Sequence, residues 1–115
     1  MASLALAIPV LPGKTEGVRK IFKAIKTEKW KEYDRSQKRA GVKKERDFLQ
    51  SSPMGDMVIL YLESDDFNKA FSEFGASKDP FDLWIKKELK NATGVDFSQP
   101  SSSPLPEQLI SYDSS

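Results

Sequence analysis

Three stretches of the chain carry the alternation of a β-strand. Residues 3–11 alternate bulky and small apolar side chains, so both faces of the expected strand are apolar. Residues 57–62 are apolar at every position, as in a strand that is covered on both faces. Residues 42–50 alternate weakly and are mostly charged, which is typical of the edge of a sheet. The pattern therefore predicts two strands that need cover on both faces and one polar edge strand.

Apolar residues at helical spacing predict one long helix after the first strand. We expect it to begin at Thr15, the N-cap, and to carry an apolar stripe from Val18 to Ile25 on its inner side. The pattern continues to Gly41, which suits a left-handed C-cap because it has no side chain.

A second helical region follows the apolar strand. Its first helix is expected to be capped by Ser64 or Asp65, and Asp79 to cap a second helix that starts at Pro80. Several aromatic residues of this region fall on one helical face and are interpreted as core: Phe74, Phe81 and Trp84. Beyond this region, residues 98–106 are rich in proline and serine and are expected to be extended.

The predicted order is strand, long helix, strand, strand, paired helices, strand, in which residues 109–112 form the last strand. This is the βαββαβ order of ferredoxin-like domains, with a four-stranded antiparallel sheet and helices on one face. We therefore expect one α+β domain, with a core in residues 1–97 and an extended segment with a short edge strand in residues 98–115. Two copies are expected to cover the apolar open face by packing sheet on sheet as a homodimer.

The amino-acid composition limits the kinds of disulfide, metal and cofactor site that are expected in the chain. The 115 residues include no cysteine, which argues against disulfides and thiolate metal sites and favours the reducing cytoplasm. They include no histidine, the usual ligand of haem and zinc, so no cofactor and no metal site is expected. The apolar opening is broken by Pro9 and Pro12 and is too short to cross a membrane, so it is interpreted as a strand rather than a signal.

Charge is distributed unevenly along the chain. Residues 14–46 carry 13 Lys and Arg against 5 Asp and Glu, although the net charge of the whole chain is only +1. A basic stretch is one feature of nucleic-acid binding, and a solvated helix face balanced by the acidic half is the other interpretation. The third strand lacks the basic and aromatic pattern of RNA-binding sheets, which disfavours nucleic acid as a partner.

A candidate ligand site lies where the inner stripe of the long helix turns polar. The stripe continues through Tyr33 and Ser36, and Arg46, Phe48 and Gln50 share one face of the edge strand by their period of two. These five residues are the predicted ligand-binding site, and the forked donors of arginine suit a carboxylate or enolate. The alternative is that the polar end of the helix overhangs the sheet and is solvated.

Several motifs resemble a known family. The stretches LPGKTE, GVKKERDFLQSSPMGDMVILYLESDD, SKDPFDLWIKKEL and PLPE resemble a small uncharacterised family of the dimeric α+β barrel superfamily, over nearly the whole chain. The combination of LQxxPxGD with DPFDxW is the most specific part. The resemblance implies a ferredoxin-like unit that dimerises through its sheet into an α+β barrel, with a ligand cleft between the sheet and the long helix. The haem-binding branches of the superfamily rely on a histidine, which this chain lacks.

Three functional hypotheses follow. The first is a homodimeric α+β barrel protein that binds a small organic or anionic ligand, including the case of a cofactor-independent enzyme with monooxygenase- or isomerase-like chemistry. The second is a non-catalytic structural or regulatory dimer. The third is nucleic-acid binding by the basic helix. The residues alone leave open whether the protein is an enzyme.

Overall fold

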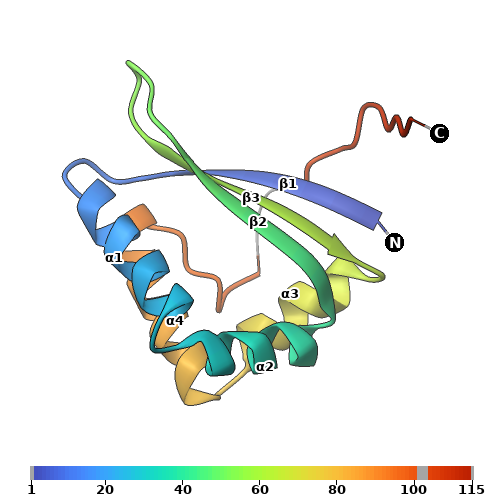
Figure 1. The fold of residues 1–115 in the computed structure, drawn as a ribbon, viewed down its shortest axis with the longest axis horizontal. Coiled ribbons are helices and arrows are strands. Elements are labelled where there is room, and N and C mark those ends of the chain that lie inside the picture. The colour runs from blue at the N-terminus through green and yellow to red at the C-terminus, as the bar shows by residue number, and fades with distance from the viewer. Residues whose placement is uncertain (1, 101–103, 115) are drawn as a thin grey trace.

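A computed structural model describes residues 2–100 and 104–114 of the chain, with three strands and four helices in that part (Figure 1). Along the chain, the elements are β1 (Ala2–Pro9), α1 (Thr15–Lys26), α2 (Trp30–Ala40), β2 (Val42–Gln50), β3 (Met57–Ser64), α3 (Phe67–Ala76) and α4 (Pro80–Thr93). All four helices lie on the same side of the sheet, so one sheet face is covered and the other is open.

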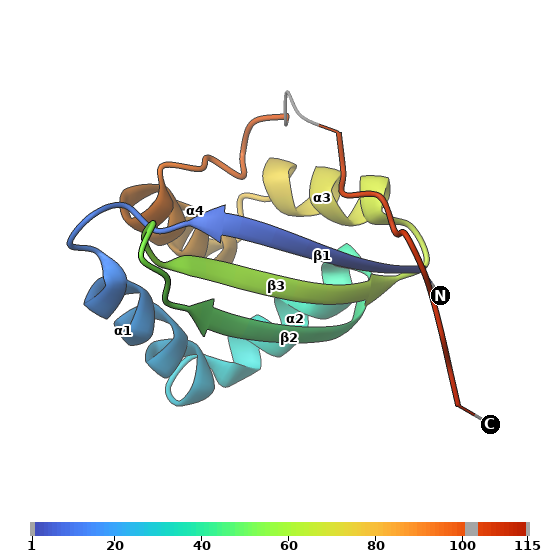
Figure 2. The same cartoon turned by 90° about the horizontal axis from the view of Figure 1, so that it is seen from above.

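The sheet is antiparallel, with the strand order β1-β3-β2 (Figure 2). The apolar strand β3 is central, and the charged strand β2 is at an edge, as the hydrophobic pattern predicts. In the register, Leu60 of β3 lies between Leu6 of β1 and Asp47 of β2. Because side chains alternate between faces, this row points to the helices and the next row points away from them.

The predicted four-stranded βαββαβ sheet is wrong. The described residues contain a three-stranded sheet, and residues 109–112 form no strand. The predicted α+β class is confirmed, but the predicted ferredoxin-like arrangement and the predicted barrel of two four-stranded sheets are wrong. Pro104 and Pro106 lack the N–H that a strand ladder needs, and the apolar cluster after them is too short to offset this. Residues 101–103, part of the predicted extended segment, lie outside the described residues.

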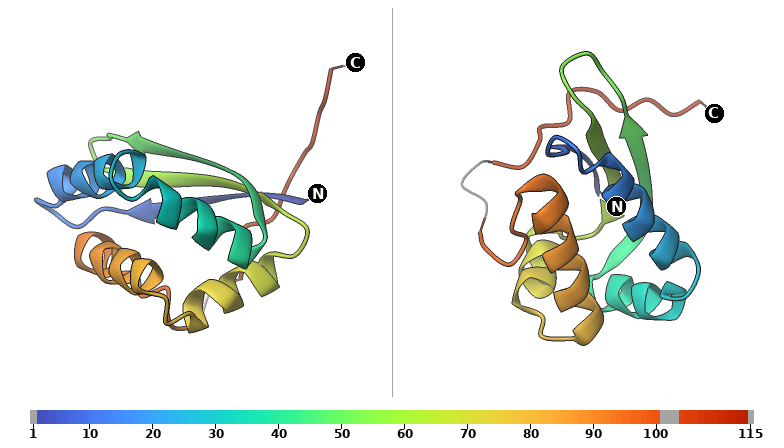
Figure 3. Two further views of the ribbon diagram at one scale, coloured as in Figure 1. Left: turned by 60° about the horizontal axis from the view of Figure 1, so that its bottom comes forward. Right: turned by 90° about the vertical axis from the view of Figure 1, so that its left-hand side faces the viewer.

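The long helix is two helices, because the chain bends between Lys26 and Trp30. The hydroxyl of Thr27 donates to the carbonyl of Lys23 at 2.8 Å, a contact that bends helices. The N–H of Lys29 bonds to the carbonyl of Ala24, five residues back, so the regular ladder is broken. Figure 3 shows that α2 leaves the direction of α1 after this turn.

The predicted helix caps at Gly41 and Asp79 are confirmed. Gly41 ends α2 in the left-handed region, with φ of 81°, which side chains other than glycine rarely adopt. Asp79 accepts a hydrogen bond from the N–H of Phe81 at 3.0 Å, and Pro80 is the first residue of α4.

Two other predicted caps are wrong. Thr15 lies inside α1, and its hydroxyl donates to Asp56 at 2.7 Å instead of capping the helix. The cap of α3 is Asp66, one residue later than expected, and it accepts from the N–H of Lys69 at 3.0 Å. Ser64 is buried at the end of β3, where its hydroxyl donates to the carbonyl of Gly41.

One hydrophobic core joins the helices to the covered sheet face. Its buried members come from both strands and helices: Val10, Val18, Ile21, Ile25, Val58, Phe81, Ile85 and Ala92. Phe74 and Trp84 are half-buried and pack against this cluster, so the three predicted core aromatics are confirmed. Burial of such side chains stabilises the fold by about 25 cal/mol for each Å² of apolar surface removed from water.

The open sheet face carries a row of apolar side chains. Ala7, Ile59 and Phe48 lie side by side across the three strands, next to Ala5 and Tyr61. Phe48, on the edge strand β2, is 59% exposed and extends this apolar row to the edge of the sheet.

The last described residues run past the edge of the sheet. The amide of Gln108 donates to the hydroxyl of Ser3 at 3.0 Å, which holds the segment near the start of β1. Beyond this point the segment leaves the body of the molecule, and Leu109, Ile110 and Tyr112 are each more than 80% exposed (Figure 3).

A buried carboxylate joins α4 to its neighbours. Asp82 is 2% exposed and accepts hydrogen bonds from Ser36 on α2, from Ser77 at 2.6 Å and from Arg39 at 3.1 Å. Burial by itself raises the pKa of Asp82, but the hydrogen bonds and the charge of Arg39 outweigh it and hold this pKa below its ordinary value. The carboxylate is therefore a structural anchor.

We predict that Asp82→Ala lowers the free energy of unfolding by about 3 kcal/mol, because three donors lose their acceptor. Chemical denaturation at pH 7 measures this loss, and Asp65→Ala, at an exposed aspartate, is the control. Since the folded pKa is lowered, the stability due to Asp82 is present above the unfolded pKa and is lost as the pH falls through the folded one. An equal loss in both variants, or a loss that persists in acid, would contradict the role of the anchor.

Candidate functional site

A cleft of about 1280 Å³ lies between α1, α2 and the edge strand β2. It is open to solvent, and its aromatic lining comes from Phe22 of α1, from Trp30 and Tyr33 of α2 and from Phe48 of β2. The bend after α1 produces this space, because a single straight helix cannot follow both the core and the edge strand. Behind the cleft, between the helices and the sheet, is an apolar cavity of about 110 Å³.

Four polar side chains separate the cleft from the inner cavity and line both. We call Tyr33, Gln37, Glu45 and Asp47 the polar cluster. Tyr33 and Gln37 are four residues apart on α2, so they lie on the same side of the helix. Glu45 and Asp47 are two residues apart on β2 and share the face that points to the helices.

Hydrogen bonds connect the polar cluster. The amide nitrogen of Gln37 donates to Glu45 Oε1 at 2.6 Å and to the hydroxyl oxygen of Tyr33 at 3.1 Å. The hydroxyl of Tyr33 also lies within hydrogen-bonding reach of Glu45. Glu45 is therefore the acceptor at the centre of the cluster.

Asp47 is the unusual member of the cluster. Its Oδ1 atom is buried, and no described residue donates a hydrogen bond to it. Burial raises the pKa of Asp47 to about 9, and the hydrogen bond to Glu45 and the charge of that residue act in the same direction. Asp47 therefore keeps its proton at neutral pH and can donate it to Glu45.

Tyr33 is held as a neutral phenol. Burial raises the pKa of its hydroxyl, and Glu45 raises it further, as does the charge that Asp47 gains above about pH 9. The ring packs against Trp30, with centroids 5.4 Å apart, and meets Phe81 edge to face at 6.4 Å. Its position is therefore fixed by the core on one side and by the cluster on the other.

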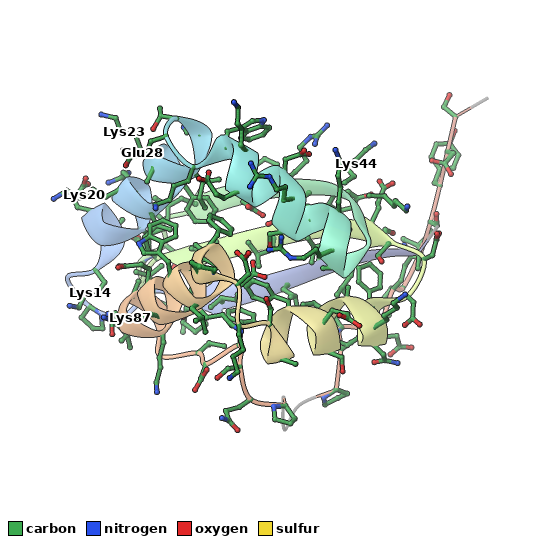
Figure 4. All side chains as sticks on the ribbon, turned by 90° about the horizontal axis from the view of Figure 1, so that it is seen from below. Lys14, Lys20, Lys23, Glu28, Lys44 and Lys87 are labelled. Atoms are coloured by element: carbon green, nitrogen blue, oxygen red, sulfur yellow. The ribbon has the colours of Figure 1, made fainter. Side chains whose placement is uncertain are left out.

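The outer part of the cleft is basic. Its charged lining consists mainly of Lys and Arg: Arg19, Lys23, Lys26, Lys38, Lys43, Lys44 and Arg46, with Asp34 as the acidic exception. Figure 4 shows Lys23 on α1 and Lys44 on β2 directed away from the body of the molecule. The cleft thus has a carboxyl pair at its inner end and positive charge at its rim.

Of the five predicted site residues, Tyr33, Arg46 and Phe48 line the cleft. Ser36 lines the inner cavity, but its hydroxyl is committed to Asp82. Arg46, Phe48 and Gln50 share one face of β2, as predicted, but it is the face opposite to Glu45 and Asp47, and Gln50 lies outside the cleft lining. Leu49 lies opposite Val58 and packs against the core, which sets the orientation of the strand. The residues that alternate with Leu49 therefore point to the open face, and the prediction had taken their face as the inward one.

Three members of the polar cluster were not predicted as site residues: Gln37, Glu45 and Asp47. Gln37 follows Tyr33 by one helical turn, and this spacing was available in the sequence. Glu45 and Asp47 lie four and two residues before Leu49, so all three side chains point to the same face of β2. Carboxyl groups are rarely buried, so nothing in the sequence marks this face as the covered one. Only the pairing of β2 with β3 shows that they point inward.

Other kinds of site are not indicated in the described part of the chain. Its residues contain no group of three His, Cys, Asp or Glu side chains placed to hold a metal ion. No helix there is long and apolar enough to cross a membrane.

We predict that Asp47→Asn stabilises the protein at neutral pH, since the amide can donate to Glu45 and never ionises. In the unfolded chain Asp47 releases its proton near pH 4, whereas the folded chain holds it to about pH 9. Wild-type stability therefore falls relative to the variant across this window, by at most about 1.4 kcal/mol per pH unit.

Thermal melting between pH 4 and 10 tests this dependence. The stability difference between Asp47→Asn and wild type is expected to grow with pH and to become constant above about pH 9. Asp65→Asn, at an exposed position, is the control and is expected to show no such growth. A difference that does not depend on pH would show that Asp47 is not protonated in the folded chain.

Comparison of the chain with models of protein families, with curated proteins and with solved structures found no match. The resemblance to the dimeric α+β barrel superfamily thus stays a prediction from the sequence motifs. Functional conclusions for this chain rest on the geometry and electrostatics of the cleft.

Proposed function

We propose that this protein binds a small organic ligand in the cleft between α1, α2 and β2. The observation that carries the proposal is the polar cluster, whose four side chains converge where the cleft meets the inner cavity and line both. A few polar groups that converge in a largely apolar pocket are characteristic of ligand sites.

The shape and lining of the cleft support the same proposal. Sites for small molecules are concave and mostly apolar, with a few polar groups that converge on one point. Here Phe22, Trp30 and Tyr33 provide flat apolar surface, and the polar cluster provides the convergent groups. A neutral phenol and a neutral carboxylic acid are also groups that a cofactor-independent enzyme can use for proton transfer. We propose that the cleft binds a ligand, and this includes the case in which the bound ligand is a substrate.

We predict that titration with phenol, indole and benzoate shifts backbone amide resonances of the cleft in two-dimensional NMR spectra. At millimolar concentration, at least one of the three is expected to move the signals of Tyr33, Gln37 and Asp47. Tyr33→Ala is expected to weaken that binding by about tenfold, because it removes a ring and a hydroxyl from the lining.

Gln50→Ala is the matched control, since Gln50 lies on the opposite face of β2 and outside the cleft lining. It is expected to leave binding unchanged. Shifts that are absent, or that fall equally on the cleft and on distant surfaces, would contradict a ligand site and favour the alternative of a structural or regulatory protein without one.

The second part of the proposal is that the partner of this chain is another copy of itself. The row of Ala7, Ile59 and Phe48 on the open sheet face supports this, because proteins seldom leave a contiguous apolar patch in contact with water. A two-fold contact lets the same patch cover itself. The lack of cysteine supports the cytoplasm as the compartment of the assembly.

We predict a mass of about twice 13.0 kDa in light scattering at micromolar concentration. Phe48→Glu is expected to give the monomer without loss of folded structure, because the side chain is exposed in the single chain. Leu83→Glu replaces another exposed apolar residue on α4 and is expected to leave the dimer intact. A monomeric wild type, or equal effects of the two variants, would contradict association through the open face.

A further inference from the structure

We propose that the inner cavity is a second binding site, which takes a compact apolar molecule of about the size of benzene. The cavity has a volume of about 110 Å³ and lies between the helices and the sheet, on the other side of the polar cluster from the cleft. It is independent of the ligand that we propose for the cleft, because most of its lining comes from other residues.

Aromatic side chains dominate the lining of the cavity. Phe67 and Phe71 of α3 are only half-buried, and their rings stack with centroids 6.3 Å apart. Leu60 and Leu62 of β3 line the cavity from the sheet. Six of the seven phenylalanines of the chain line this one space: Phe22, Phe67, Phe71, Phe74, Phe81 and Phe97. Such a surface favours an apolar occupant over water.

The polar groups of the lining are already committed. The hydroxyl of Ser36 donates to Asp82, and that of Thr93 donates to the carbonyl of Leu89 at 2.7 Å. The other polar lining is the polar cluster, whose hydrogen bonds join its members to one another. The Oδ1 atom of Asp47 is buried too deeply for a ligand to touch. A buried water needs about two to four polar partners, so the cavity suits an apolar molecule better than water.

Hydrogen bonds at the C-terminal end of α3 hold the wall of the cavity in place. Lys86 of α4 is buried, and its ammonium group donates to three carbonyl oxygens there, at 2.8 Å to Phe74, 2.9 Å to Gly75 and 3.0 Å to Ser77. Phe97 meets Phe74 edge to face, with centroids 6.4 Å apart, and a Cβ atom at Gly75 would lie 2.9 Å from the carbonyl oxygen of Phe97. The wall therefore cannot close on the cavity without breaking these contacts, and the space persists.

The volume of the cavity suits one small hydrocarbon. Protein interiors are packed so closely that voids larger than a water molecule are few. An apolar cavity of roughly 150 Å³ lined by leucine, isoleucine and phenylalanine stays dry and binds benzene or xenon. The cavity of about 110 Å³ here is somewhat smaller, and the half-buried ring of Phe71 leaves room for adjustment. Compact hydrocarbons are therefore the ligand class that fits it.

NMR titration with benzene at pH 7 tests the site. We expect saturable shifts, with a millimolar dissociation constant, in the signals of Leu62, Ala70 and Phe71, which line the cavity and not the cleft. Pyridine has the same shape and a polar nitrogen, and it is expected to bind at least about tenfold more weakly, because the donors of the lining already have acceptors. Equal binding of the two, or benzene shifts that are absent or confined to the cleft, would overturn the apolar site.

Two substitutions change the size of the cavity in opposite directions. Ala70→Leu, at a buried position of the lining, puts a larger apolar group into the space and is expected to abolish benzene binding without lowering the melting temperature. Ala24→Leu makes the same change on α1, outside both linings, and as the control is expected to retain binding. Phe71→Leu enlarges the cavity and is expected to bind para-xylene several-fold more tightly than the wild type does.

The two variants keep the site falsifiable. Benzene binding that persists in a folded Ala70→Leu would overturn it. If Ala70→Leu does not fold, Phe71→Leu decides, and para-xylene binding no tighter than that of the wild type would overturn the site. Neither result touches the ligand proposed for the cleft, which its own titrations and Tyr33→Ala test separately.

Discussion

The pairing of β2 with β3 is the constraint on which the rest of the structure depends. Leu49 lies opposite Val58 and packs against the core, so the residues at its period of two also face the helices. A shift of one residue would exchange the two faces of β2. It would put Phe48 into the core and would expose Glu45 and Asp47, which would remove both the polar cluster and the apolar patch on the open side.

The bend at Thr27 combines with this register to form the cleft. α1 follows the core through Val18, Ile21 and Ile25, whereas α2 turns to lie beside the edge strand. The turn brings the side chains of α2 to the two inward carboxyls of β2 and leaves a cleft between the helices and the strand. A carboxyl pair in this position costs stability, because ionised groups lose water when they are buried. Retaining such a cost is characteristic of binding sites rather than of packing.

Much of the fold could be predicted from local signals. The apolar run of β3, the charges of β2 and the caps at Gly41 and Asp79 each act through neighbouring residues, and the structure confirms them. The break at Thr27 could not be predicted, since no proline or glycine marks it and the cause is one side-chain hydrogen bond. The fourth strand was wrong because the apolar residues 109–112 supply a pattern but no ladder.

The candidate site was harder to predict for a physical reason. Its carboxyls come from a strand whose two faces are both mixed in polarity, so hydrophobicity alone does not say which face is buried. Leu49 decides this through a contact with another strand, and sequence periodicity contains no such information. Tyr33 was found because its inward position follows from the stripe of its own helix.

β2 also connects the two sides of the sheet. It carries Glu45 and Asp47 toward the cleft and Phe48 toward the open side, and among the described residues it pairs with β3 alone. A contact that restrains β2 from the open side reduces the backbone motion that a ligand in the cleft must otherwise suppress. Binding of the proposed ligand and of the proposed second copy would therefore favour each other through conformational entropy, without any change in mean shape.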